Sequence, residues 1–415
     1  MAAGTLTTLD EALKNVYPEQ ELRNFFSLQH QLFSRIKEKA DKRAFSGRKF
    51  IIGARSALNQ AVGPLTEGAT LHTRGSNDYL NMEVTAKYYY GVVGLSHQAI
   101  SASRSTTGAF ARMLDDNVMG TAKSLRQDMA RDACYGAGFG ELGRIAAGGV
   151  SGTTLTLETQ PTVVGMPGSR FFSPTSTIES YTALSGGAAG ASNRTVSSVS
   201  ASASTIVVDA NTGFTAGDYI FRQGGRGNAM MGLRGIVDST THVSTFQNLS
   251  RTTYPQLQAG VLANSGTLRA WTPELMDSLF SEPWNNGGGE WPTAAYSRLE
   301  IQQRAAAYIR NDRRADMKEM TLDNGYKTVG WTTPDGMKPW IVDQFCVPNT
   351  VMAVKEDDLF WAEQEPVQWE DGDGGGKWRF TDRTHTYEAW LYTYTNLCAW
   401  QTNNCSVLRD VSHTS

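Results

Sequence analysis

The sequence predicts an α+β protein, and three segments carry that prediction. Residues 48–95 have the alternating apolar and polar pattern of a long β-hairpin. Residues 109–135 repeat apolar side chains every three or four positions, as one long helix does. Beyond residue 325, short alternating runs indicate that strands dominate the C-terminal part. We therefore expect a fold that combines helices with several β-structures.

The composition is that of a globular protein. The chain has 415 residues, enough for two or three domain-sized units with their own cores. Hydrophobic residues make up 40 % and charged residues 19 %, which is too apolar for a disordered chain. The net charge of −3 excludes a polycation that binds nucleic acid with its whole surface. Neither an apolar run of about 18 residues nor a signal-peptide core is found, so we expect a cytosolic product without membrane contact.

Residues 1–47 are predicted to form an N-terminal arm with helical pieces, because Leu28, Leu32 and Ile36 recur at helical steps. Between positions 35 and 55 there are eight Lys or Arg side chains and two acidic ones. We call its first part the basic segment: Arg35, Lys37, Lys39, Lys42 and Arg43. Two interpretations remain open, a solvated or neighbour-paired charged face and a surface that contacts internal nucleic acid.

The hairpin of residues 48–95 is unusually long. Residues 48–62 lead outward, a Gly- and Thr-rich stretch turns, and residues 79–96 return through three consecutive tyrosines. About 15 residues per leg at about 3.3 Å each give an arm on the order of 50 Å long. An isolated two-stranded ribbon is marginal in water and its edges invite pairing. The arm must therefore lie either on its own chain's sheet or on a neighbouring copy.

The helix of residues 109–135 has an apolar stripe that interruptions limit at its end. The predicted core positions of this stripe are Phe110, Leu114, Val118, Leu125 and Met129. Asp128 and Asp132 interrupt the stripe, and Gly136 and Gly138 stop the helix. At 1.5 Å per residue, such a helix is about 40 Å long.

The remaining segments divide into a β-rich middle and a helical region before the final strands. Residues 150–260 are rich in Gly, Ser, Thr and Ala, contain no lysine, and are predicted to form a β-rich insertion. Thr272 followed by Pro273 predicts a helix start, and residues 294–314 predict a second helix. In the last long strand, Trp390, Tyr392 and Tyr394 alternate onto one face.

Nothing in the sequence points to catalysis, a cofactor or a metal, so we predict no enzyme. The glycine cluster at residues 136–143 follows a helix, whereas a dinucleotide loop follows a strand. Asp371 and Asp373 have calcium-like spacing without the distant Glu of a calcium loop, which favours a polar hairpin turn. The six histidines form no zinc pattern, and no nucleophile elbow occurs. The cysteines form no C-x-x-C pair and are expected to be free buried thiols: Cys134, Cys346, Cys398 and Cys405.

Several stretches carry a resemblance to a known family. They are LKNVYPEQELRNFF from residue 13, VTAKYYYGVVGLSHQAISAS from residue 84, GAFARMLDDNVMGTAKSLRQDMARDACYGAG from residue 108, TGFTAGDYIFRQGG from residue 212, and YEAWLYTYTNLCAW from residue 387. Their wording and order resemble the major capsid proteins of tailed double-stranded DNA phages, whose fold is named after phage Hong Kong 97. The likeness runs over most of the chain.

The resemblance implies a division of the chain into named parts. These are the N-terminal arm (1–47), an extended E-loop (48–95), a P-domain (96–149 and 350–415) with the long helix as its spine, the insertion (150–260), and an A-domain around the capsomer centre (261–349). The E-loop would lie over the neighbouring subunit, and its expected inter-subunit contacts are Arg55, Leu65, Glu67, Leu71, Arg74 and Tyr79.

The function that the resemblance implies is self-assembly into the hexamers and pentamers of an icosahedral or prolate phage head. The head would enclose double-stranded DNA, bound without sequence specificity, and would assemble in the cytoplasm of the bacterial host. Expected partners are further copies of the chain, a portal protein at one vertex and a separate scaffolding protein, since the arm begins almost at Met1; a decoration protein is left open. Residues 63–76 contain no lysine, so no autocatalytic lysine cross-link between subunits is expected.

Two alternatives remain. An encapsulin-type nanocompartment shares the fold but encloses enzyme cargo. A non-assembling surface protein or adhesin could be built on the Ser-, Thr- and Gly-rich residues 150–260, although the missing signal peptide argues against it.

Overall fold

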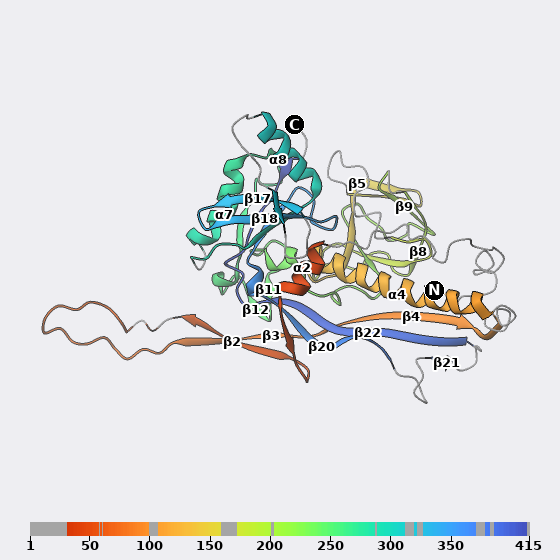
Figure 1. Cartoon of the computed structure of the whole chain (residues 1–415), viewed down its shortest axis with the longest axis horizontal. Helices are drawn as coiled ribbons and strands as arrows, with labels where there is room; N and C mark the ends of the chain where they lie inside the picture. The colour runs from red at the N-terminus through yellow and green to blue at the C-terminus, as the bar shows by residue number, and fades with distance from the viewer. Residues whose placement is uncertain are drawn as a thin grey trace.

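The computed structural model describes residues 31–57, 59, 61–98, 107–158, 172–200, 203–286, 289–311, 319–321, 327–370, 378–381 and 386–412. In this part of the chain the body contains a five-stranded sheet beside a long helix, a closed barrel, and a seven-stranded sheet with two helices. A two-stranded arm extends away from this body (Figure 1). The predicted α+β class is confirmed.

The five-stranded sheet is organised around β22 (Thr386–Ala399). β4 (Lys87–Ser96) runs antiparallel along one edge of β22. β20 (Leu359–Trp369) and then β21 (Arg379–Thr381) pair with the other edge, and β1 (Asp41–Ala44) adds a parallel strand to β20. The alternating sequence of β22 buries every second side chain, so one face of this sheet belongs to the main core.

Helix α4 (Thr107–Cys134) lies along that buried face, beside β4 and β22 in Figure 1. The prediction of one long helix at 109–135 is confirmed. Its C-terminal half buries Leu125 and Met129. Gly91 on β4 allows the close approach, because a Cβ at this position would lie 2.8 Å from Cγ2 of Thr121, well inside van der Waals contact.

A glycine turn leads from α4 into a closed barrel with the strand order β10-β5-β6-β9-β8-β7. Gly138 and Gly140 have φ angles of +90° and +78°, which glycine adopts without strain. The strands are β5 (Glu141–Ser151), β6 (Thr154–Leu157), β7 (Thr177–Tyr181), β8 (Arg194–Ser200), β9 (Thr205–Val208) and β10 (Tyr219–Arg222). The β-rich segment therefore begins at Glu141, earlier than predicted, because the turn places a strand directly after the helix.

The seven-stranded sheet has the order β13-β23-β19-β15-β18-β17-β16. Its strands are β13 (Gly260–Leu262), β15 (Ala294–Ser297), β16 (Glu319–Thr321), β17 (Lys327–Thr333), β18 (Gly336–Val342), β19 (Val351–Val354) and β23 (Ser406–Leu408). Two helices accompany it, α7 (Pro273–Asn286) and α8 (Leu299–Asn311). The predicted start at Pro273 is confirmed, but the helix predicted from residue 294 begins only at Leu299. The four residues of β15 are fully buried between β18 and β19, and a short apolar run does not by itself distinguish helix from strand.

Short elements connect these units. They are α6 (Leu233–Ile236), β11 (Thr245–Phe246), β12 (Leu249–Ser250), η1 (Pro255–Leu257), β14 (Arg269–Ala270), η2 (Glu356–Asp358) and β24 (Val411–Ser412). The fully buried Arg251 holds the segment around α6 and η1 together, because its guanidinium donates to the carbonyls of Gly235, Ile236, Val243 and Leu257.

The arm is a hairpin of β2 (Phe50–Ala57) and β3 (Asp78–Val84), with pairing from Phe50 opposite Val84 to Ala57 opposite Asp78. The paired legs have 8 and 7 residues, so the prediction of two legs of about 15 residues is wrong. The returning leg divides at Thr85: residues up to Val84 pair with β2, whereas β4 pairs with β22.

The hairpin predicted around Asp371 and Asp373 is also wrong for the flanking strands. Asp371 and Asp373 themselves lie outside the described residues. β20 and β21 both run antiparallel to β22 along its same edge, so they follow one another in one direction and do not pair with each other.

Candidate assembly surfaces

The arm presents its predicted contact residues to solvent. Arg55, Leu65, Glu67, Leu71, Arg74 and Tyr79 are all exposed in the single chain. Leu71 is 83 % exposed, and Val62, which was not singled out from the sequence, is 80 % exposed. Large apolar side chains this accessible on an extended segment are typical of surfaces that another molecule covers.

The root of the arm is fixed to the body. Ile52, Met82 and Val84 are buried in one cluster with Phe360 and Cys398 of the five-stranded sheet. The backbone N–H of Glu83 donates to the carbonyl of Gln247, and the Glu83 carboxylate pairs with Lys49. The arm therefore leaves the body in a defined direction while its distal part has few contacts with it (Figure 1).

A second exposed surface lies on the five-stranded sheet, on the face opposite α4. We call it the aromatic face: Tyr88, Tyr90 and Val92 on β4 and Trp390, Tyr392 and Tyr394 on β22. In the strand register Tyr88 lies opposite Tyr394, Tyr90 opposite Tyr392, and Val92 opposite Trp390, so all six side chains emerge on one side. The sequence signalled the β22 half through its alternation, but it could not show that the tyrosines of β4 lie beside it.

The structure divides the basic segment. Arg35 lies on α2 (Gln31–Lys39), is buried, and makes a bidentate ion pair with Glu356. Arg35 is therefore unavailable to an external partner. The remaining members, Lys37, Lys39, Lys42 and Arg43, are exposed. Arg43 pairs with Asp41 at 2.6 Å, so the local charge is partly neutralised within the segment.

The predicted core stripe of the long helix is found in its described part. Leu125 and Met129 are buried and Val118 is half-buried. The side chains of Phe110 and Leu114 lie outside the described residues.

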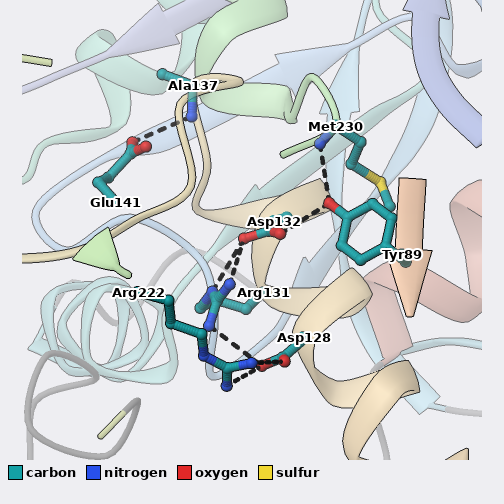
Figure 2. Close-up of polar contacts among 8 residues, drawn as sticks. All are labelled: Tyr89, Asp128, Arg131, Asp132, Ala137, Glu141, Arg222 and Met230. Atoms are coloured by element: carbon teal, nitrogen blue, oxygen red, sulfur yellow. Dashed lines mark hydrogen bonds and ion pairs between the residues drawn. The ribbon is translucent and has the colours of Figure 1, made fainter. Parts of the chain in front are cut away.

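The two acidic residues that interrupt this stripe join the helix to the barrel (Figure 2). Asp132 accepts two hydrogen bonds from the Arg131 guanidinium, at 2.7 and 3.0 Å, and one from the Tyr89 hydroxyl at 2.8 Å. Asp128 receives the Arg222 guanidinium from strand β10. Burial raises the pKa of Asp132, and the Arg131 charge opposes that shift. The polar interruption in the stripe is thus the joint between α4, β4 and the barrel.

Lys87 is engaged within its own chain. Its ammonium donates to the carbonyl of Gly227 at 2.6 Å, and burial lowers its pKa. Among the described residues, no group of three or more His, Cys, Asp or Glu side chains could hold a metal ion. The four cysteines are free and buried. In the same described ranges, no helix is long and apolar enough to cross a membrane.

Comparison with known proteins gives a structural answer. No protein-family model and no curated protein matches the chain. The structure "Cyanophage A-1(L) capsid asymmetric unit" aligns over 98 % of this chain and 99 % of that one, with a TM-score of 0.56 at 12 % identity. The chain has a phage-capsid fold. The Hong Kong 97-type fold expected from the sequence is thereby confirmed.

Two weaker likenesses to this capsid fold complete the comparison. One is to the holo-SrpI encapsulin complex from Synechococcus elongatus PCC 7942, with a TM-score of 0.49, 9 % identity and coverage of 100 % and 98 % of the two chains. The other is to the capsid of Myoviridae phage XM1, with a TM-score of 0.48, 8 % identity and coverage of 96 % and 97 %.

Proposed function

We propose that this chain is a major capsid protein, which assembles into the hexamers and pentamers of a phage head that encloses double-stranded DNA. The observation that carries the proposal is the arm: its root is fixed to the body, while Val62 and Leu71 are 80 % and 83 % exposed. A chain with the capsid fold that projects such side chains away from itself is suited to gripping a neighbouring copy.

The physics of a shell fits such contacts. Each contact between two copies can be weak, because every copy is held by several neighbours at once and closed symmetry multiplies the contacts. A covering neighbour would also remove the arm's apolar side chains from water, at about 25 cal/mol per Å² of apolar surface.

The proposal includes further partners. A separate scaffolding protein and a portal protein would direct assembly in the bacterial cytoplasm, and packaged DNA would be bound through its backbone charge. Lys37, Lys39, Lys42 and Arg43 are the exposed cations proposed for that contact. Replacing all four by Gln should reduce DNA retention in assembled heads without changing their size, whereas unchanged retention would mean that these side chains are merely solvated.

Electron microscopy of the purified protein, expressed alone and with the neighbouring genes, tests the proposed function. Uniform shells, or rings of six and five subunits, would support it. The contents of the shells then distinguish the two shell-forming candidates, since nucleic acid is expected in a phage head and enzyme cargo in an encapsulin. Single subunits under both conditions would contradict the proposal.

A further inference from the structure

We propose that the aromatic face is the surface on which the arm of a second copy lands. This inference rests on the proposed function and adds to it a specific receiving surface on the partner copy. Its six residues lie on β4 and β22, and Tyr88, Tyr90 and Val92 are each more than half exposed.

The same face of the same sheet already accepts the arm at its root. Phe360 on β20 lies opposite Cys398 on β22, and both are buried under Ile52 and Met82 of the chain's own arm. Along β22, the side chains at 398, 394, 392 and 390 share this face. The chain's own arm covers one end of the face and leaves the rest open, so a second arm would extend an existing interface.

The open part of the face is preorganised. Tyr90 donates to the Tyr394 hydroxyl at 3.1 Å, and Gln368 donates to the Tyr392 hydroxyl at 2.8 Å. The rings of Tyr88 and Tyr394 pack edge to face with 4.8 Å between their centroids. Fixed tyrosine and tryptophan side chains lose little freedom on binding, and these residue types are enriched at the energetic centres of protein interfaces.

The arm has side chains that suit this surface. Leu65, Leu71 and Tyr79 are exposed apolar groups. Glu365 and Glu388 flank the aromatic side chains, opposite Tyr394 and Arg379 in the strand register. The exposed arginines of the arm, Arg55 and Arg74, carry the charge that complements these carboxylates.

The charge on the face argues against two other occupants. Residues 1–30 of a neighbouring copy contain four acidic and two basic side chains, so they carry the same sign of charge as Glu365 and Glu388. DNA would be repelled by these carboxylates for the same reason. The arm is the segment of this chain that combines exposed apolar side chains with exposed arginines.

A cross-linking experiment between two differently substituted proteins tests the proposal. One protein carries Leu71→Cys on the arm and the other carries Tyr90→Cys on the aromatic face; the four native cysteines are buried. The two are co-assembled and treated with a short bifunctional maleimide, so that a heterodimer can form only between copies. The matched control pairs Leu71→Cys with Tyr308→Cys, an exposed aromatic position on α8.

We expect a cross-linked dimer from the 71–90 pair and little or none from the 71–308 pair. Assembled particles that give no 71–90 dimer, or that give equal amounts from both pairs, would overturn this inference while leaving the proposed function intact. Failure of the unsubstituted protein to form particles would instead overturn the proposed function. As a second measurement, Tyr90→Ser with Val92→Ser should raise the concentration needed for assembly by about tenfold or more, while Tyr308→Ser should not; no rise would also overturn the inference.

Discussion

The Arg35 guanidinium and the Glu356 carboxylate form a bidentate ion pair, with nitrogen–oxygen distances of 2.5 and 2.8 Å. Both side chains are almost completely buried, and the Tyr296 hydroxyl donates a further hydrogen bond to Glu356. Glu356 belongs to η2, far along the chain, so this pair fastens α2 to the body. The Leu32 N–H reinforces the attachment by donating to Asp343.

Removing one partner of this pair should be costly. Arg35→Met leaves the Glu356 charge buried, so we expect a loss of about 3 to 5 kcal/mol in the free energy of unfolding. Replacing Arg35 and Glu356 by Met and Leu together, with Tyr296→Phe, should recover most of that loss because no polar group is then left without a partner. Chemical denaturation of the unassembled subunit measures both effects. Lys37→Met, at an exposed position of the same helix, is the control and should change stability little; an equally small effect of Arg35→Met would contradict the account.

The joint between α4 and the barrel separates a buried contact from an exposed one. Asp132→Ala leaves Arg131 and the Tyr89 hydroxyl without their acceptor, so we expect a loss of about 3 kcal/mol or more. Arg222→Ala removes a pair in which the arginine side chain is 52 % exposed, and exposed pairs contribute about 1 kcal/mol or less. Comparing the two variants by thermal unfolding tests this order, and a larger loss for Arg222→Ala would contradict it.

His242 should make the subunit acid-sensitive. Burial, together with the nearby Arg234 and Arg409, lowers the pKa of its imidazole from 6.5 to about 4. The unfolded chain therefore takes up a proton in a pH range where the folded chain does not. The free energy of unfolding should fall as the pH drops from about 6.5 to about 4, by at most about 3 kcal/mol from this group.

His242→Gln tests the assignment, since it should flatten the pH dependence of unfolding in that window. Asp238, which accepts hydrogen bonds from the backbone of His242 and Val243 and from Arg409, has a lowered pKa and acts in the same direction at still lower pH. An unchanged slope between pH 6.5 and 4 in the variant would show that other groups cause it.

The arm should be required for assembly but not for folding. A variant in which residues 58–77 are replaced by a short Gly-containing turn keeps the pairing of β2 with β3 and the buried root. We expect an unfolding midpoint close to that of the unaltered subunit, together with loss of shell formation. Shells of normal yield from this variant would remove the arm from the assembly mechanism.

Local periodicity was sufficient for the long helix and for the exposed arm, and it failed where partners decide the structure. Residues 81–96 alternate without interruption, yet they belong to two strands, because Val84 pairs within the arm and Lys87 begins the pairing with β22. The pattern records which side chains face a surface but not which strand lies beside them. For the same reason the sequence indicated Trp390 and Tyr394 as one face, whereas the β4 half of the aromatic face followed only from the register.

Arg35 shows a similar limit for the candidate site. A cluster of cations in the sequence suggests a single charged surface, but a long-range partner such as Glu356 cannot be identified from residues 35–43 alone. Burial of one member and exposure of its neighbours followed from the helical turn between Arg35 and Lys37, which places them on different sides of α2.

The most direct test of the central claim is sedimentation velocity of the purified chain, alone and co-expressed with its neighbouring genes, over a range of protein concentrations. We predict closed particles many times heavier than the 45.3 kDa subunit, which become single subunits when the arm is shortened. A single species at the mass of one subunit, independent of concentration and of co-expressed partners, would contradict the account.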